Sequence, residues 1–263
     1  MAAYSMSAIN TTSFLELGNR AFSQGRYQRA LDYYQKALET AHADTDLLAD
    51  LYGSIGNVYG ASGQVEQAVV YYQKAVEILR RKEDYGRLGT TFVNIGNLYA
   101  DQGNGSQAVH YYKQGILLLE QERKWGELAT VYGNLSLLSL KESDPPSALD
   151  YAKKGLGFAK RLNQPAQLAD AYHRLAKAKE AAGETEKALR YSETAYAFYD
   201  QLNDEMGCAM TLYHQASLYE DKGDNERAIR CLEQVVAIDE KYRLPKLSEN
   251  KARLEKLREK ISH

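Results

Sequence analysis

The sequence predicts an all-α fold, a solenoid of six stacked helix-turn-helix repeats, because three columns of residues recur along its 263 positions. The first helix of each repeat carries a small residue, at Gly18, Gly56, Gly96, Ser136, Ala176 and Ala216. A turn residue follows at Gly25, Gly63, Gly103, Ser143, Gly183 and Gly223, and the second helix carries Ala30, Ala68, Ala108, Ala148, Ala188 and Ala228. Neighbouring members of each column are 38, 40, 40, 40 and 40 residues apart. A fixed period in this range is typical of repeat architectures.

The composition favours helices and argues against several classes of function. The chain has 44% hydrophobic residues and only 4 prolines, which suits a folded helical protein. Its net charge of -2 gives no basic signature for nucleic acid or for an anionic membrane surface. The longest aliphatic run, residues 116–119, is far shorter than the ~20 residues of a membrane span, and residues 1–14 lack the pattern of a signal peptide. We therefore expect a cytoplasmic protein without membrane insertion.

The chain divides into repeats and two ends. We predict a flexible leader at residues 1–10, repeats at about 11–43, 46–83, 86–123, 126–162, 165–202 and 205–241, and a capping helix at 245–261. Hydroxyl side chains at residues 11–13 are expected to cap the first helix, and Gly25 to end it, since glycine adopts a left-handed turn cheaply. In the fourth repeat, Asp144 is the expected cap of the second helix and Pro145 its first residue.

The residues after Pro245 predict the capping helix. Charged residues surround its apolar stripe, which consists of Leu247, Leu254, Leu257 and Ile261. A repeat array needs such an end, and the segment is short for a heptad dimer seam. Most of the 21 tyrosines fall in packing columns, so we interpret them, and Trp125, as core residues rather than a stacking surface. Cys208 and Cys231 lie on different predicted helices without metal-ligand spacing, which predicts free thiols and no metal site.

These columns, with aromatic residues at Tyr34, Tyr59, Tyr72, Tyr99 and Tyr112, resemble tetratricopeptide repeats over residues 11–241. The 40-residue period is longer than the ~34 of the common repeat and is similar to that of Leu-Gly-Asn adaptors and kinesin light chains. Residues 17–19, 55–57 and 95–97 match the Leu-Gly-Asn signature. The resemblance implies a right-handed superhelix whose first helices line a concave groove. In this family the groove binds an extended or helical peptide segment of another protein.

Asparagines recur on the face that the resemblance assigns to the groove. The position after the small column and the position two before it are three apart, so they share one helical face. The asparagines at these two positions are Asn19, Asn57, Asn94, Asn97 and Asn134. An Asn amide offers a donor and an acceptor, so our hypothesis is that this ladder holds the main chain of a bound segment. The alternative is that these asparagines are solvated or stabilise their helices without a ligand, although nothing local explains their recurrence.

The later repeats place basic and imidazole side chains on or near the same face. These residues are Lys141, His173, Arg174, Lys177 and His214. They could favour an acidic segment or a terminal carboxylate, which Arg174 could bind with two hydrogen bonds. Alternatively, Asp170, Glu180 and Asp221 neutralise them. The two-carboxylate clamp of chaperone-binding tetratricopeptide domains is not reproduced, because the early repeats lack the required Lys and Arg.

No sequence motif indicates an enzyme, a cofactor or a metal. The leading interpretation is a non-enzymatic scaffold or adaptor that binds a peptide segment of a partner protein. One alternative is a structural protein that self-associates through residues 1–13 or the final helix. A second alternative is a regulator that senses a small peptide, although no output domain precedes the repeats in this sequence.

Overall fold

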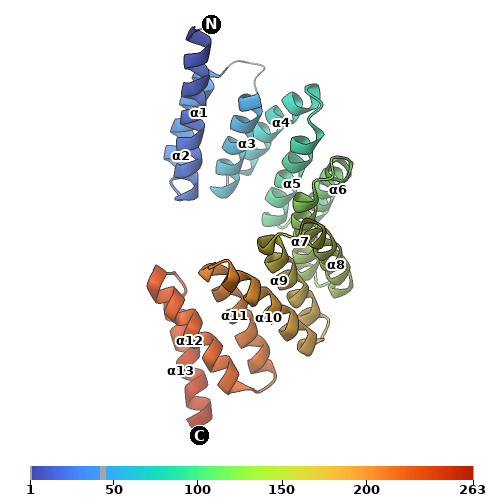
Figure 1. Cartoon of the computed structure of the whole chain (residues 1–263), viewed down its shortest axis with the longest axis vertical. Helices are drawn as coiled ribbons and strands as arrows, with labels where there is room; N and C mark the ends of the chain where they lie inside the picture. The colour runs from blue at the N-terminus through green and yellow to red at the C-terminus, as the bar shows by residue number, and fades with distance from the viewer. Residues whose placement is uncertain (1, 42–45, 263) are drawn as a thin grey trace. The chain divides into compact units, whose positions relative to one another are not determined.

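The computed structural model describes residues 2–41 and 46–262, with side chains from 11–41 and 46–261, and these residues form thirteen helices and no strand (Figure 1). The helices are α1 Ala2–Ser23, α2 Tyr27–Thr40, α3 Asp46–Ala61, α4 Val65–Arg81, α5 Tyr85–Asp101, α6 Gly105–Gln121, α7 Trp125–Lys141, α8 Pro145–Leu162, α9 Pro165–Ala181, α10 Thr185–Gln201, α11 Glu205–Asp221, α12 Asn225–Tyr242 and α13 Leu247–Ser262. The all-α class is confirmed. Six consecutive helix pairs and one terminal helix match the predicted order of elements.

The helices belong to two compact units, Met1–Lys124 with α1 to α6 and Trp125–His263 with α7 to α13. In the first unit α1 packs on α2, α3 on α4 and α5 on α6, and neighbouring pairs meet through α2 with α3 and α4 with α5. In the second unit the pairs are α7 with α8, α9 with α10 and α11 with α12, while α13 packs on α12. Within each unit, a pair therefore buries its apolar face partly against its neighbouring pair, as stacked repeats require.

The predicted leader is wrong for residues 2–10, which form the start of α1, while Met1 lies outside the described residues. The segment contains alanine and methionine and no glycine or proline, so nothing in it ends a helix. Thr11 is consequently not an N-cap. Its side chain is buried, and its hydroxyl lies 2.8 Å from the hydroxyl of Thr40 on α2.

The turn column behaves as predicted within the pairs. Gly25, Gly63, Gly103, Gly183 and Gly223 all have φ between +70° and +77°, a region that glycine enters without steric cost. Ser143 takes the same role in the fourth repeat with φ +59°, followed by Asp144, which accepts a bond of 3.2 Å from the backbone N–H of Ser147, and by Pro145 at the start of α8. The capping role that we predicted for Asp144 is confirmed.

A second column of left-handed residues lies between the repeats and was not predicted. Its members are Glu83, Arg123, Asn163, Asn203 and Arg243, with φ between +52° and +55°. They are spaced 40 residues apart, like the turn column, but only two of them are the asparagines that tolerate this conformation well. The backbone therefore imposes the turn here without help from glycine.

Aromatic residues fill the space between the helices of a pair. Tyr59 stacks on Tyr71 at 5.4 Å between ring centroids, and Tyr99 on Tyr111 at 5.5 Å, one repeat later. Trp125 stacks on Phe158 at 5.8 Å. Parallel rings at these distances are favourable packing contacts. The interpretation of these tyrosines and of Trp125 as packing residues agrees with these contacts.

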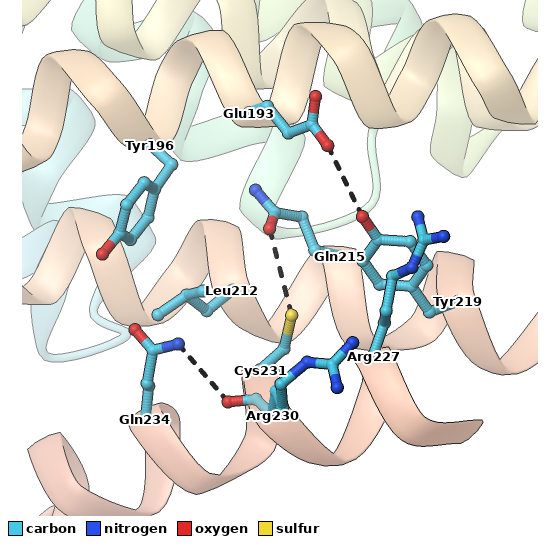
Figure 2. A pocket seen from close by; sticks show the side chains of 9 residues that line it. All are labelled: Glu193, Tyr196, Leu212, Gln215, Tyr219, Arg227, Arg230, Cys231 and Gln234. Carbon is cyan, nitrogen blue, oxygen red and sulfur yellow. Dashed lines mark hydrogen bonds between the residues drawn. The ribbon is translucent and has the colours of Figure 1, made fainter. Parts of the chain in front are cut away.

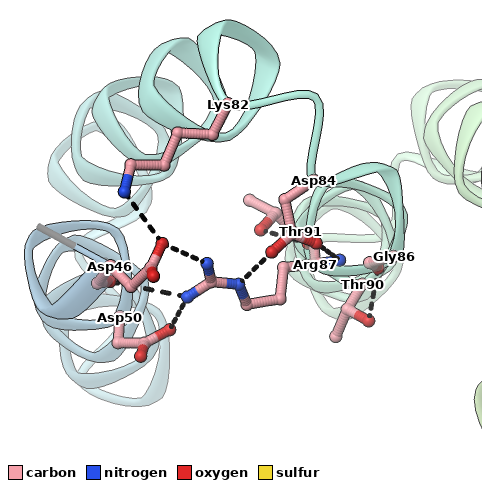
Figure 3. Close-up of polar contacts among 8 residues, drawn as sticks. All are labelled: Asp46, Asp50, Lys82, Asp84, Gly86, Arg87, Thr90 and Thr91. Carbon is pink, nitrogen blue, oxygen red and sulfur yellow. Dashed lines mark hydrogen bonds and ion pairs between the residues drawn. The ribbon is translucent and has the colours of Figure 1, made fainter. Parts of the chain in front are cut away.

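One ionic network ties the start of α3 to the start of α5 (Figure 3). The Arg87 guanidinium contacts three carboxylates, at 2.7 Å from Asp46, 3.1 Å from Asp50 and 2.6 Å from Asp84, and Lys82 also contacts Asp46 at 3.1 Å. Hydrogen bonds from Arg87 and Lys82 lower the pKa of Asp46. Burial acts to raise the pKa of Asp84, but its hydrogen bonds with the backbone and side chain of Arg87 outweigh burial and lower it.

The final helix α13 covers the end of the second unit. Leu254 and Leu257 are buried in the core, and Leu247 packs against the same cluster. Ile261, the last member of the predicted apolar stripe, is 46% exposed because it lies one turn beyond the last buried leucine, Leu257. Polar contacts fix the helix as well, with the Asn250 amide donating to Asp239 at 2.7 Å and Arg253 donating to Glu220 at 2.8 Å.

Candidate functional site

The first three repeats share an arrangement of glycine, asparagine and tyrosine. In the third repeat the ring of Tyr112 lies directly over Gly96, where an added Cβ would meet two ring carbons at 2.6 Å. The Tyr112 hydroxyl then reaches the next residue and donates to the Oδ1 atom of Asn97 at 2.8 Å. The first and second repeats repeat the geometry, with bonds of 2.7 Å from Tyr34 to Asn19 and from Tyr72 to Asn57.

These bonds give a local reason for the recurrence of asparagine after the small column. The interpretation that no such reason exists is therefore wrong for Asn19, Asn57 and Asn97. Each amide satisfies the hydroxyl of a largely buried tyrosine. Burial raises the pKa of Tyr72, which keeps its hydroxyl protonated and able to donate. The bond also fixes the orientation of each Asn amide, since its oxygen must face the tyrosine.

The second half of the chain lacks all three members of this arrangement. Sixteen residues after the small column, where the first three repeats have Tyr34, Tyr72 and Tyr112, the last three have Ala152, Ser192 and Leu232. Ser136 replaces the glycine in the fourth repeat, and its hydroxyl donates to the carbonyl of Ala148 at 2.8 Å. The joint loss of glycine, asparagine and tyrosine is visible in the sequence and could have identified the contact.

Three of the predicted site residues line one cavity of about 250 Å³ in the first unit. They are Asn57 on α3 and Asn94 and Asn97 on α5. The remaining lining residues come from α1, α3, α4 and α5, and they are Phe22, Gly60, Ala61, Tyr72, Leu98 and Asp101. Sequence reasoning missed Gly60, Ala61 and Asp101, although each lies three or four residues beyond an asparagine and therefore one helical turn along the same face.

The cavity offers hydrogen-bonding groups of both kinds. The Oδ1 atom of Asn57 accepts a hydrogen bond from the Tyr72 hydroxyl, and the Asn57 NH2 group donates to none of the residues that the structure describes. The side chain of Asn94 is half-buried and likewise has no hydrogen-bond partner within 11–41 or 46–261. Asp101 is exposed at the end of α5 and supplies carboxylate oxygens. Together these donors and acceptors can bind the N–H and C=O groups of a peptide main chain.

The other predicted asparagines lie elsewhere. Asn19 is exposed on α1 and does not line the cavity. Asn134 is half-buried on α7 and belongs to the second unit. Of the five predicted asparagines, three therefore line one cavity, and the other two, Asn19 and Asn134, lie outside it.

Among the predicted basic residues of the second unit, Arg174 is less available than the sequence suggests. Arg174 extends from α9 to α7, where its Nη1 donates to the carbonyl of Gly133 at 3.3 Å. Gly133 allows this approach, since an added Cβ would lie 2.5 Å from the Arg174 side chain. Lys177 is half-buried on α9 and Lys141 is exposed at the end of α7. A hydrogen bond to the backbone leaves Arg174 less freedom to grip a carboxylate with both of its nitrogens.

His173 and His214 are buried side by side and are not open groove residues. Both are 5% exposed, with ring centroids 5.5 Å apart and planes nearly perpendicular. Burial, reinforced by the nearby His214, Lys177 and Arg174, lowers the pKa of His173 to about 3, so the ring is neutral at pH 7. The Nε2 atom of His214 lies 3.0 Å from Glu180, which agrees with the alternative that acidic neighbours neutralise this face.

A second cavity of about 330 Å³ lies among α10, α11 and α12 (Figure 2). The Gln215 Oε1 atom accepts a weak bond from the Cys231 thiol at 4.0 Å, and the Tyr219 hydroxyl donates to Glu193 at 3.4 Å. Cys208 and Cys231 are both buried free thiols, as predicted, and burial raises the pKa of each to about 11. Thiols of this kind are protonated at pH 7 and react slowly.

Within residues 2–41 and 46–262, no group of three or more His, Cys, Asp and Glu side chains is arranged to hold a metal ion. Over the same part of the chain, no helix is both long and apolar enough to span a bilayer.

Comparison with known proteins places the fold in a family. The model of the MalT-like TPR region matches residues 17–257, whereas a comparison with curated proteins finds no match. Among solved structures, BtubC (BKLC) from P. vanneervenii is similar with a TM-score of 0.61 and 19% identity, over 77% of this chain and 91% of that one.

Two further structures are similar in fold. A STAND protein with a tetratricopeptide repeat sensor, from Pyrococcus horikoshii, has a TM-score of 0.76 and 16% identity over 95% of this chain, but the match spans only 39% of that protein. The Rap conjugation gene regulator of the plasmid pLS20, solved in complex with the Phr peptide, has a TM-score of 0.67 and 18% identity over 97% of this chain and 75% of that one. The repeat columns, the helix pairs and the family match together show that this chain belongs to the MalT-like TPR region family of tetratricopeptide repeats.

Proposed function

We propose that the chain is a protein-interaction module that binds an extended segment of a partner protein along α3 and α5 of its first unit. The observation that carries the proposal is the cavity in which Asn57, Asn94 and Asn97 converge. The amide NH2 groups of Asn57 and Asn94 donate no hydrogen bond to any residue that the structure describes. Asparagine is only a middling helix former. Asn94 accepts no hydrogen bond from a tyrosine among the described residues, so a bound ligand is the best explanation for an asparagine at this position.

The chemistry of the cavity suits a peptide main chain more than a particular side chain. Amide donors from Asn57 and Asn94 match carbonyl oxygens, and the Asp101 carboxylate matches an N–H group. Phe22, which also lines the cavity, offers an apolar contact for one side chain of the segment. Binding of this kind has little sequence specificity at the main-chain contacts, so neighbouring surfaces must supply the rest of the affinity.

The family and the similar structures support a peptide as the ligand. One of the similar folds was solved with a bound peptide, the Rap regulator with Phr. At 18% identity this likeness concerns the fold alone. It supports the general statement that a helix-pair array of this type can hold a peptide.

The test begins with a peptide selected against the purified full chain from a random display library, and it measures dissociation constants by fluorescence polarisation. Asn94→Ala is expected to weaken binding about five- to thirtyfold, which corresponds to the loss of one or two hydrogen bonds of about 1 kcal/mol each. Gln107→Ala, which removes an exposed amide from α6, is the matched control and is expected to bind as the parent chain does.

Asn57→Asp separates the structural role of asparagine from its binding role. The carboxylate still accepts the Tyr72 hydroxyl, but it cannot donate to a peptide carbonyl. We expect the fold to be kept and the affinity to fall. Unchanged affinity in both Asn94→Ala and Asn57→Asp contradicts the proposal. If the chain instead self-associates through an end, light scattering will show an oligomer that grows with concentration and disappears on truncation of that end.

A further inference from the structure

Four lysines converge on a third cavity, of about 370 Å³, in the second unit. Lys153 and Lys160 come from α8, Lys179 from α9 and Lys187 from α10. The walls between them are apolar or aromatic and consist of Leu156, Leu175 and Tyr191, with Gly157 beside them. None of these residues belongs to the asparagine cavity, and none was singled out as a site from the sequence.

The positive charge of this cavity is only partly compensated. Glu184 is the shared partner of two of the lysines, at 2.6 Å from Lys179 and in direct contact with Lys187. Within 11–41 and 46–261, neither Lys153 nor Lys160 forms an ion pair, although Lys160 lies 6.0 Å from the centre of the Tyr172 ring. Four cations against one carboxylate leave a local charge of about +3 by simple counting, in a chain whose net charge is -2.

Two residues at the cavity are poor choices for packing alone. Lys179 occupies the column that holds Tyr59, Tyr99 and Tyr219 in other repeats, and it is only 8% exposed. Burial of a lysine ammonium is costly unless it is paired. Gly157 lies inside α8 with no atom within 4 Å of the place where a Cβ would stand, so no close approach requires glycine there. Local choices that disfavour stability are often found at functional sites.

We propose that this cavity binds a small molecule that carries a diphosphate or triphosphate group. A lysine ammonium group is a compact point charge that can bind phosphate oxygens. The counted charge of about +3 matches that of a diphosphate near neutral pH. The volume lies at the lower end of small-molecule sites, and the wall of Leu156, Leu175 and Tyr191 can cover an apolar or aromatic part of the ligand.

The test is isothermal titration calorimetry of the full chain with inorganic pyrophosphate and tripolyphosphate, with orthophosphate for comparison. We expect saturable binding that is tighter for the two polyphosphates than for orthophosphate and that weakens as salt is raised. The double variant Lys153→Gln with Lys160→Gln is expected to lose at least tenfold in affinity. The control Lys154→Gln removes a lysine of the same helix that pairs with Asp150 at 2.8 Å and does not line the cavity, and it is expected to bind normally.

A second variant tests the charge argument in the opposite direction. Glu184→Gln releases Lys179 and Lys187 from their shared carboxylate and is expected to tighten pyrophosphate binding severalfold. A role in folding alone predicts no such gain. Circular dichroism verifies that each variant is folded. The proposal is overturned if no polyphosphate binds at millimolar concentration, or if the double variant binds as tightly as the parent chain.

Discussion

The contact between Gly96 and Tyr112 can be tested by exchanging both residues for a pair that the chain already uses. Repeat six has Ala216 where repeat three has Gly96, and Leu232 where repeat three has Tyr112. Both of these residues are fully buried. We therefore predict that Gly96→Ala and Tyr112→Leu are each destabilising. The double variant should lose less free energy of unfolding than the sum of the two single losses.

The magnitudes follow from the local geometry. In Gly96→Ala the new methyl group would lie 2.6 Å from two carbons of the Tyr112 ring, so the ring must retreat by about 0.8 Å to reach an ordinary contact. Such overpacking costs about 1–3 kcal/mol, and a lost bond to Asn97 adds about 1, while alanine recovers about 1 in helix propensity. Tyr112→Leu costs about 2–3 kcal/mol from lost packing and the lost bond. The methyl group no longer meets a ring in the double variant, so we expect a favourable coupling of about 1–2 kcal/mol.

Urea unfolding followed by circular dichroism gives the free energy of unfolding of the parent chain and the three variants. Similar slopes of free energy against urea are needed for the comparison, since a changed slope signals a changed unfolding mechanism. If the double variant loses the sum of the two single losses to within about 0.5 kcal/mol, the contact is not what couples these positions.

Three other perturbations have defined outcomes. Arg87→Ala should lower the free energy of unfolding by only about 1–2 kcal/mol, because the Arg87 side chain is one-third exposed and water screens its ion pairs. Arg87 lowers the pKa of Asp46 and Asp84, so the parent chain loses stability as these carboxylates are protonated below about pH 4, and the variant should lose less over the same range. His173→Gln should remove a loss of up to about 1.4 kcal/mol per pH unit as the pH falls from about 6.5 toward 3, because the unfolded ring binds a proton that the buried ring refuses. Arg123→Gly should stabilise the chain by about 0.5–1 kcal/mol, since φ is +53° there. Urea titrations, run across pH for the first two, measure all three.

Each of these perturbations has a matched control. Arg80→Ala removes an exposed arginine that has no ion pair with any described residue and should leave the acid response unchanged. His110→Gln changes an exposed imidazole on α6 and should keep the slope between pH 6.5 and 3. Lys113→Gly places glycine inside α6 and should destabilise by about 1 kcal/mol, the opposite sign to Arg123→Gly. Equal effects in variant and control would contradict the corresponding argument.

Most of the fold could be predicted from the sequence because the residues that specify its turns and helix pairs are local and recur in every repeat. Gly25 and its equivalents mark turns because glycine adopts a positive φ without steric cost, and in the fourth repeat the cap residues Asp144 and Pro145 mark the turn instead. The sequence does not predict conformation where no characteristic residue marks a turn or the end of a helix. Arg123 adopts a left-handed conformation, although arginine has no preference for it. Residues 2–10 are helical because they contain no glycine or proline that would end the helix.

The site was predicted in part. The spacing of three residues predicts that Asn94 and Asn97 share one helical face, and both line the same cavity. The bond from Tyr112 to Asn97 was missed because it joins two columns on different helices, and each column was considered by itself. His173 was misplaced because it precedes Arg174 by one residue, and a step of about 100° around the helix is enough to turn a side chain from the surface into the core.

The central claim is that Asn57, Asn94 and Asn97 face a bound segment. The most direct measurement is a spectrum of the side-chain amide groups of asparagine by nuclear magnetic resonance, recorded while a selected peptide is titrated into the full chain. We predict that the signals of Asn57 and Asn94 shift or broaden with the saturation of binding, while those of Asn203 and Asn225 stay in place. Binding that leaves Asn57 and Asn94 unchanged and moves only signals outside the cavity would contradict the account.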